Sequence, residues 1–462
     1  MRKNRLLFPV LLVGMLAITS CFSKPQTREK EEYVVIETPS KRMPAEFEPV
    51  STVKLCYPEM MPLSAYKLIA DHNKVLVLVH PNSRGNSRIE EATSRFTAAS
   101  INMENVTFLD MNLDGDREYW IRDFSPFYVF DELNLSVVDF TYNRPLRVNQ
   151  NNVPSRLAAY LNMSYFKMDL VHTGGNLMQD GRGTAFSDDL VISENNNNEE
   201  KVRQQMKEYT GTDNYVITID PQGDYIAHID CWGKIVAPDK IVVARLPRSH
   251  ERYSYYEEVA RVLENTTCAY GYNYKVYRID EPGNQIAPYT NSLITNNYVY
   301  MPLGENEQYN QRAIETYKEA LPGYTIIGVE GYNFNDYYCF LNTDALHCRT
   351  HEIPDKDMLF IDSREVLNGV VRLKDNYLVK TNVVSYAKKD IKEVKLHYSI
   401  NNKGYITVDM DKYEDTTNYT YYFENLKSGD DVKYCITAVD KGSHSSVDPT
   451  CGELDPHHFV IE

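Results

Sequence analysis

A cysteine set among basic side chains is the first candidate for chemistry in this chain. Cys348 lies between His347 and Arg349, and His351 follows three residues on. Because neighbouring positive charge can lower the pKa of a thiol, Cys348 is a candidate nucleophile. A single cysteine is more often a small buried apolar residue, so this pattern alone does not establish catalysis.

A histidine and a carboxylate stand two residues apart at His228 and Asp230. If the segment is a strand, alternation of its side chains places both on one face. The two groups could then serve as an acid–base group and as the holder of a cation. They could equally be a satisfied pair in the core.

An aromatic ring and a carboxylate occur together at Trp120 and Asp123. This combination suits a guanidinium group, which stacks on rings and donates forked N–H bonds to carboxylates. The alternative is a core tryptophan beside a surface ion pair of Arg122 and Asp123. The glycines Gly174 and Gly175 could let backbone approach such a site closely, although ordinary turns use the same pattern.

Taken together and in this order, the motifs resemble those of guanidine-modifying enzymes, most closely the Porphyromonas-type peptidylarginine deiminases. The resemblance covers residues 46–358 and continues into the C-terminal region. It implies a five-bladed, pseudo-symmetric α/β propeller of ββαβ modules with the active site at its centre, whereas the sequence pattern itself indicates only α/β. The motifs that carry the resemblance are Trp120-x-Arg122-Asp123, Gly174-Gly175-Asn176, His228-x-Asp230, Tyr289–Ile294 and Thr343–Glu352.

The resemblance also implies a reaction, the hydrolysis of peptidyl-arginine to peptidyl-citrulline and ammonia, with no metal and no organic cofactor. Cys348 would attack the guanidinium carbon, and His228 would act as acid and then as base. Asp123 and Asp230 would hold the guanidinium nitrogens. The other expected site residues are Asn291 near the nucleophile, and Trp120, Tyr225, Arg144 and Arg147 near the substrate.

The preferred arginine depends on a short segment after residue 142. In the peptidylarginine branch, two arginines of an Asn-Arg-Pro-Arg segment bind the carboxylate of a C-terminal arginine. Here Arg144 matches, Leu146 stands at the second position, and Arg147 follows. In a strand, Arg147 would face the other way. We therefore expect C-terminal arginine to be favoured, but with a weaker or broader preference than in that branch.

Two other functions remain open. An agmatine or free-arginine deiminase would use the same chemistry, but agmatine deiminases typically carry an acid directly before the paired glycines, where this chain has Thr173. A non-catalytic surface-binding lipoprotein would not need an intact catalytic set. That set is complete here and comprises Asp123, His228, Asp230 and Cys348.

The elements that must position these residues form two domains. From 46 to 358, amphipathic helices alternate with short β-branched runs, which predicts an α/β domain. Helices are expected at 87–100, 253–264 and 310–320, and strands at 75–79, 241–244, 274–279 and 324–329. From 359 to 462 only short strands follow, which predicts a small immunoglobulin-like β-sandwich. Cys435 and Cys451 could pair within it in an oxidising compartment.

The N-terminus predicts export. Residues 1–21 combine a basic leader with an apolar stretch too short to span a bilayer comfortably, and they end in a sequence that resembles a lipobox. Cys21 would carry the lipid, residues 22–45 would form a tether, and the protein would be anchored in the cell envelope. The net charge of -16 argues against nucleic acid as a partner. It favours cationic partners such as arginine-containing peptides, or it serves only solubility.

Overall fold

The computed structural model describes residues 35–113, 119–283, 288–331, 339–341 and 343–462. The predicted signal peptide, Cys21 and residues 22–34 of the predicted tether lie outside the described residues. Within the described ranges, no helix is both long enough and apolar enough to cross a membrane.

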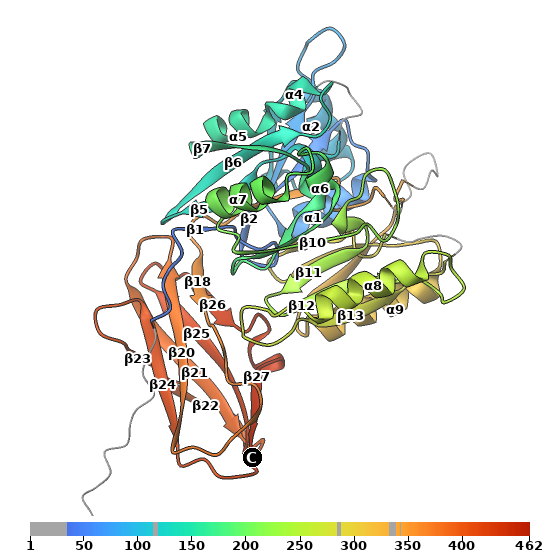
Figure 1. The fold of residues 1–462 in the computed structure, drawn as a ribbon. Helices are drawn as coiled ribbons and strands as arrows, with labels where there is room; N and C mark the ends of the chain where they lie inside the picture. The colour runs from blue at the N-terminus through green and yellow to red at the C-terminus, as the bar shows by residue number, and fades with distance from the viewer. Residues whose placement is uncertain (1–34, 114–118, 284–287, 332–338, 342) are drawn as a thin grey trace, which may run out of the picture. The chain divides into compact units, whose positions relative to one another are not determined.

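Five small sheets between residues 41 and 354 repeat one topology (Figure 1). In each, two strands pair antiparallel and a helical crossover leads from the second strand to a parallel third. The sheets are β17(His351–Pro354)–β2(Val50–Tyr57)–β3(Val75–Val79)–β4(Val106–Asp110), β1(Lys41–Arg42)–β5(Phe127–Asp131)–β6(Asn134–Tyr142)–β7(Ser164–His172), β8(Met178–Gln179)–β9(Thr184–Asp188)–β10(Asn214–Thr218), β11(Gly233–Ala237)–β12(Lys240–Arg245)–β13(Lys275–Asp280) and β14(Leu293–Thr295)–β15(Tyr298–Pro302)–β16(Thr325–Val329).

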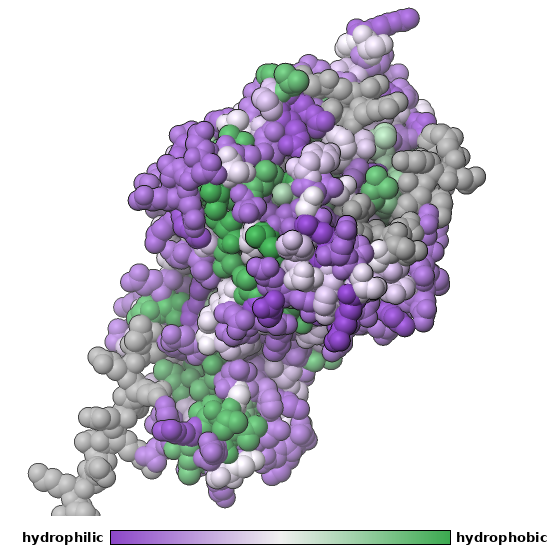
Figure 2. Space-filling view, turned by 45° about the vertical axis from the view of Figure 1, so that its right-hand side comes forward, coloured by the Kyte–Doolittle hydropathy of each residue, from purple (hydrophilic) through white to green (hydrophobic). Residues whose placement is uncertain are grey.

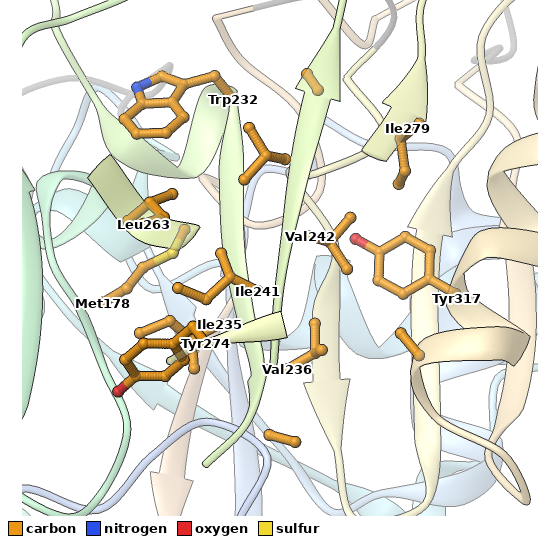
Figure 3. Packing of buried hydrophobic residues seen from close by; sticks show 14 of the residues in the cluster. Met178, Trp232, Ile235, Val236, Ile241, Val242, Leu263, Tyr274, Ile279 and Tyr317 are labelled. Carbon is orange, nitrogen blue, oxygen red and sulfur yellow. The ribbon is translucent and has the colours of Figure 1, made fainter. Parts of the chain in front are cut away.

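The crossover helices are α1(Leu63–His72), α2(Ile89–Ala98), α4(Val148–Asn151), α5(Val153–Leu161), α6(Leu190–Ser193), α7(Glu199–Thr210), α8(Tyr253–Glu264) and α9(Glu307–Ala320). Because helices cover the sheets, the inner parallel strand β3 is buried and apolar along its whole length. In β12, Ile241 and Val242 point to opposite sides of the strand, and Val242 faces Tyr317 of α9 (Figure 3). The predicted α/β domain is thereby confirmed.

Residues 359–461 form two sheets that enclose one apolar core. Apart from the parallel pair β19–β27, their strands pair antiparallel. The first sheet is β18(Leu359–Asp362)–β20(Asn376–Ser385)–β24(Asn418–Glu424)–β23(Asp411–Lys412), and the second is β19(Gly369–Val371)–β27(His457–Ile461)–β25(Asp431–Asp440)–β21(Ile391–Ile400)–β22(Ile406–Asp409), with β26(Ser445–Asp448) beside β25. Cys435 and Cys451 do not pair; both are free thiols. Cys435 lies on strand β25, whereas Cys451 lies in the segment that follows β26.

Part of the predicted tether belongs to the folded domain. Residues 22–45 were predicted as tether, but Lys41–Arg42 form strand β1 and pair with β5. Arg42 is buried, donates to both carboxylate oxygens of Glu48 and lies over the ring of Phe360. Met43 and Ala45 are buried as well. The sequence of this segment is charged and contains prolines, so it did not predict a folded strand. Its burial depends on partners that are distant in sequence.

The visible surface is mostly hydrophilic, with separate apolar patches (Figure 2). This agrees with a chain of net charge -16.

A buried arginine links the α/β domain to the two C-terminal sheets. Arg182 donates to the carbonyl oxygen of Ile361 (3.0 Å) and to Oδ1 of Asp448 (2.9 Å). Its side chain is 5% exposed, and that of Asp448 is 1% exposed. Breaking a buried pair leaves an uncompensated charge, which costs much more than the loss of a surface contact.

Replacing Arg182 by alanine is therefore expected to lower the free energy of unfolding by about 3–5 kcal/mol. Urea unfolding monitored by circular dichroism measures this change. Arg364→Ala is the control, because Arg364 pairs with Asp362 of β18, which Arg182 also approaches (3.8 Å), but the side chain of Arg364 is 32% exposed. Equal destabilisation by the two substitutions would contradict the structural role given to Arg182.

Candidate active site

The segments that follow different sheets converge on one buried site. Asp123 lies in α3(Ile121–Phe124), His228 immediately precedes the 3-10 turn η3(Ile229–Cys231), and Asp230 lies within that turn. Asn291 precedes β14, and Cys348 precedes β17. All five side chains are buried, although the sequence separates the first from the last by 225 positions. The predicted catalytic set is therefore brought together.

Asn291 holds the candidate nucleophile from two sides. Its Nδ2 donates to Sγ of Cys348 (3.2 Å), and its Oδ1 accepts from the backbone N–H of Cys348 (3.2 Å) and of His347 (2.9 Å). One amide thus fixes both the backbone and the sulfur of Cys348. This agrees with the predicted place of Asn291 beside the nucleophile.

The basic neighbours of Cys348 in the sequence do not face its thiol. Arg349 makes a bidentate pair with Asp344, and both ring nitrogens of His347 face carboxylates. A hydrogen bond from Cys231 lowers the pKa of Cys348, but burial and the carboxylates of Asp230, Asp344 and Asp123 raise it, to about 11 overall. The expectation of a lowered thiol pKa is wrong for the unliganded protein, because adjacency in sequence does not give proximity of charges.

Alkylation of Cys348 by iodoacetamide is accordingly expected to be slow at neutral pH. Only the thiolate reacts, so with a pKa of about 11 the rate should rise about tenfold per pH unit through the mildly alkaline range. Cys231→Ala should slow alkylation further at each pH, because it removes the hydrogen bond that lowers the pKa of Cys348. Mass spectrometry of the peptide that contains Cys348 measures the rate. A rate independent of pH in this range would contradict the charge environment described here.

His228 and Asp123 face each other across the site. Nδ1 of His228 lies 3.7 Å from Oδ1 of Asp123. Gly175 makes this approach possible, because a Cβ there would overlap the His228 ring and lie 2.9 Å from Oδ1 of Asp123. A Cβ at Gly174 would overlap the carbonyl oxygen of Arg122. The interpretation of the paired glycines as a place of close backbone approach is confirmed.

We expected the segment around Asp230 to be a strand, but it is a turn of 3-10 helix. Asp230 points Oδ2 at Nδ1 of His347 (2.7 Å) and at Sγ of Cys348 (3.7 Å). Burial alone would raise the pKa of Asp230, but the hydrogen bond and charge of His347, with the charges of His228 and Arg122, hold it below its ordinary value. Asp230 is therefore an anion beside the sulfur.

The pKa of Asp123 moves the opposite way. Burial and the nearby Asp230 carboxylate raise it, and the charges of His228 and Arg144 offset this only in part. Arg122, its neighbour in sequence, is turned away and makes a buried bidentate pair with Glu352 (2.7 and 3.2 Å). The alternative of a surface Arg122–Asp123 ion pair is thus excluded.

Four buried polar atoms around this site have no hydrogen-bond partner among the described residues. They are Oδ1 of Asp123, Nε2 of His228, Oγ1 of Thr173 and Oδ1 of Asn143. Leaving such groups unsatisfied costs about 1–3 kcal/mol each, so they mark a place where a polar ligand binds. Acceptor oxygens predominate, and they suit a ligand with several N–H donors and a positive charge, such as a guanidinium.

The residues expected near the substrate are more exposed than the catalytic set. Trp120 is half-buried and stacks near Tyr119, and the guanidinium of Arg147 lies 5.1 Å over its ring. The segment that carries Arg147 is a loop leading into α4 and not a strand, so the expectation that Arg147 faces away does not hold. The charge of Arg144 acts on Asp123. Tyr225 is 85% exposed and has no described contact with the other site residues, so its role stays a prediction.

Sequence reasoning missed three residues that surround this set. Glu46 contacts His347 and Lys234 from beneath the site, Cys231 hydrogen-bonds to Cys348, and Glu352 binds Arg122. Glu352 ends one of the quoted motifs and Cys231 directly follows another, but nothing in their spacing indicates a partner. Glu46 is distant from every motif and carried no signal. Among the described residues, no three His, Cys, Asp or Glu side chains are grouped as metal ligands.

Comparison with known proteins agrees with this geometry. The family model described as Porphyromonas-type peptidyl-arginine deiminase matches residues 42–354. A Vibrio parahaemolyticus protein named, provisionally, as an agmatine deiminase is 23% identical over 67% of this chain and 96% of its own length. The solved agmatine deiminase of Enterococcus faecalis has a TM-score of 0.58 at 18% identity, over 70% of this chain and 99% of its own. A structure provisionally named as a peptidyl-arginine deiminase has a TM-score of 0.57 at 22% identity, over 68% and 99%.

Proposed function

Because the chain belongs to the Porphyromonas-type peptidyl-arginine deiminase family, whose members hydrolyse amidine C–N bonds of guanidino groups, we propose that its substrate is an arginine residue of a peptide. The product is then peptidyl-citrulline, released with ammonia. The observation that carries this proposal is the group of unpartnered buried atoms, led by Asp123 Oδ1 and His228 Nε2, beside the sulfur of Cys348.

The mechanism follows from the charges in the site. A guanidinium that donates to Asp123 and Asp230 brings positive charge beside Cys348, which lowers the pKa of the thiol from its value in the free protein. The thiolate attacks the guanidinium carbon, and the electron pair of one C–N bond leaves with a nitrogen that His228 protonates as ammonia. His228 then accepts a proton from water as the water attacks the same carbon. The C–S bond breaks, citrulline leaves, and the thiolate is restored.

Two arginines near the site favour a substrate that ends in a carboxylate. The charge of Arg144 acts on Asp123, and the guanidinium of Arg147 lies over the ring of Trp120. Peptides that end in arginine are therefore expected to be favoured over peptides with an internal arginine. Since Leu146 is 92% exposed and cannot bind an anion, the preference is expected to be modest.

Arg144→Ala is expected to lower kcat/KM for a peptide ending in arginine by about 10- to 100-fold, because it removes one charge-assisted hydrogen bond. The rate for the same peptide amidated at its C-terminus should change little. A ureido-group colour assay measures both rates. Equal losses for the two peptides would show that Arg144 acts on the site and not on the carboxylate.

The second candidate substrate is agmatine or free arginine, which the names of the relatives favour. Thr173 argues against agmatine, because it presents a buried, unpartnered hydroxyl where an acid would be needed to bind a second cation. Product from agmatine alone in the colour assay would move the assignment to this candidate. No product from any guanidine would favour a non-catalytic binding lipoprotein.

We further propose that the α/β domain is a propeller, that the C-terminal domain is an immunoglobulin-like sandwich, and that the protein is exported and lipid-anchored. The five sheets of one topology support their arrangement as blades of a pseudo-symmetric propeller. The two-sheet C-terminal region supports an immunoglobulin-like sandwich. Export and a lipid anchor on Cys21 in the cell envelope rest on the leader sequence alone. Labelling with a radioactive fatty acid, lost in Cys21→Ala, tests the anchor.

A further inference from the structure

A buried glutamate lies directly beneath the catalytic set. Glu46 precedes β2, and its side chain is 13% exposed. Its Oε2 accepts from Nε2 of His347 (2.9 Å) and from Nζ of Lys234 (2.5 Å), while Oε1 accepts from the backbone N–H of Ile294 (2.9 Å). Three donors fix this carboxylate in one orientation. The charges of Lys234 and His347 hold its pKa well below the ordinary value although burial opposes them.

His347 connects Glu46 with Asp230. Its Nδ1 lies 2.7 Å from Oδ2 of Asp230, and its Nε2 lies 2.9 Å from Oε2 of Glu46. Both nitrogens face carboxylate oxygens, so the ring bridges the two carboxylates. Lys234, Glu46, His347 and Asp230 thus form a buried row that ends at the sulfur of Cys348.

Asp230 and Asp123, the two carboxylates expected to bind the guanidinium, differ in the groups that contact them. Asp230 is 0% exposed and has His347 behind it, and its pKa is held below the ordinary value. Asp123 has His228 only at 3.7 Å, and its Oδ1 has no hydrogen-bond partner among the residues that the structure describes. The charged and titratable groups that face Asp230 are His347, His228, Arg122, Asp123, Cys231 and Cys348. Of these, Arg122 pairs with Glu352, whereas His347 contacts Asp230 itself (2.7 Å) and contacts Glu46 in turn.

We propose that Glu46 and His347 are positioning residues of the reaction, which keep Asp230 ionised and turned toward the guanidinium and the sulfur. Neither touches the substrate; Glu46 acts through His347, and His347 acts through Asp230. The inference rests on the proposed deiminase function, because it assigns the source of charge and orientation for one of the two carboxylates. A small polar cavity of about 40 Å³, lined by Glu46, Lys234, Arg122 and Glu352, adjoins the row and has room for water.

The first test is Glu46→Gln, which keeps the shape and the bond from Ile294 but removes the negative charge. His347 then loses the anion that faces its Nε2, and the support of Asp230 from behind is weakened. We expect kcat to fall about 10- to 100-fold with little change in KM. The contribution of Asp230 to the acid limb of the pH–rate profile should move to higher pH, because Asp230 becomes harder to ionise and its anion is lost earlier as pH falls.

Glu48→Gln is the matched control, because Glu48 is also buried and pairs with a cation, but that cation is Arg42. Its acid limb should match that of the wild-type protein. The double variant Glu46→Gln, Lys234→Met covers the case in which an unpaired Lys234 prevents folding. A folded Glu46→Gln protein whose kcat and acid limb equal those of the control would overturn the proposal.

A second measurement does not need turnover. Nitrogen NMR of the wild-type protein, with His347 assigned through His347→Gln, should show both ring nitrogens in hydrogen bonds, and a changed Nε2 signal in Glu46→Gln. A His347 spectrum that is the same in Glu46→Gln as in the wild-type protein would overturn the inference. If the wild-type protein turns over no guanidine at all, the proposed function fails, while the spectrum still decides the state of the pair.

Discussion

Replacing Cys348 by alanine is expected to abolish citrulline formation, with a loss in kcat of at least about 10⁴-fold. The sulfur is the only nucleophile among the described residues that lies against both Asp230 and Asn291. Without it, water would have to attack a resonance-stabilised cation directly. The ureido-group colour assay on a peptide that ends in arginine measures the loss.

Cys268→Ala is the matched control for this variant. Cys268 is equally buried but lies in the core cluster around β11–β13, away from the site. It should retain the wild-type rate, and circular dichroism should show that both variants are folded. Citrulline formed by Cys348→Ala within tenfold of the wild-type rate would rule out covalent catalysis at this residue.

Asp123→Asn is expected to have the second largest effect, with a fall in kcat/KM of about 10²- to 10⁴-fold. The amide keeps the shape of the side chain but replaces one acceptor by a donor and removes the charge that opposes the guanidinium. In the wild-type protein the pKa of Asp123 is raised, mainly by burial and by the Asp230 carboxylate. Activity should therefore fall at a higher pH than the ordinary aspartate value as the solution is acidified.

The variant should lose this feature of the pH profile together with most of its rate. Asp139→Asn is the control, since Asp139 is also buried but lies on strand β6 and binds Tyr165 and Lys167 of β7. An Asp123→Asn protein with unchanged kcat/KM would mean that the guanidinium does not bind where the unpartnered oxygen lies.

The regular elements could be predicted well because their patterns are local. The helix expected at 253–264 coincides with α8, and the strand expected at 75–79 coincides with β3. Apolar residues recur along α8 at helical spacing, and β3 is a short continuous apolar run. Such local patterns indicate the type of element directly. The repetition of one sheet topology could not be seen in this way, because it depends on which strands pair and not on their residue types.

For the candidate site, too, the residue types could be predicted but their spatial arrangement could not. The types and order of Asp123, His228, Asp230 and Cys348 indicated the chemistry, and the structure brings them together. The orientation of the neighbours was not predictable. Arg349 looked like an activating cation, yet it binds Asp344.

The role of Glu46 was hidden because its partner lies 301 positions away. Electrostatics of a buried site depend on distances between side chains, which a single sequence does not contain. The direction of the shift in the pKa of Cys348 could therefore not be predicted from the residues that flank it.

One measurement tests the central claim most directly. Purified protein is incubated with a peptide that ends in arginine, in the presence of EDTA, and the product is analysed by mass spectrometry beside a Cys348→Ala sample. We predict that the arginine is converted to citrulline with release of ammonia, and that the alanine variant leaves the peptide unchanged. Unchanged peptide with the wild-type protein, while agmatine or free arginine is consumed, would contradict the assignment of peptidyl-arginine as the substrate.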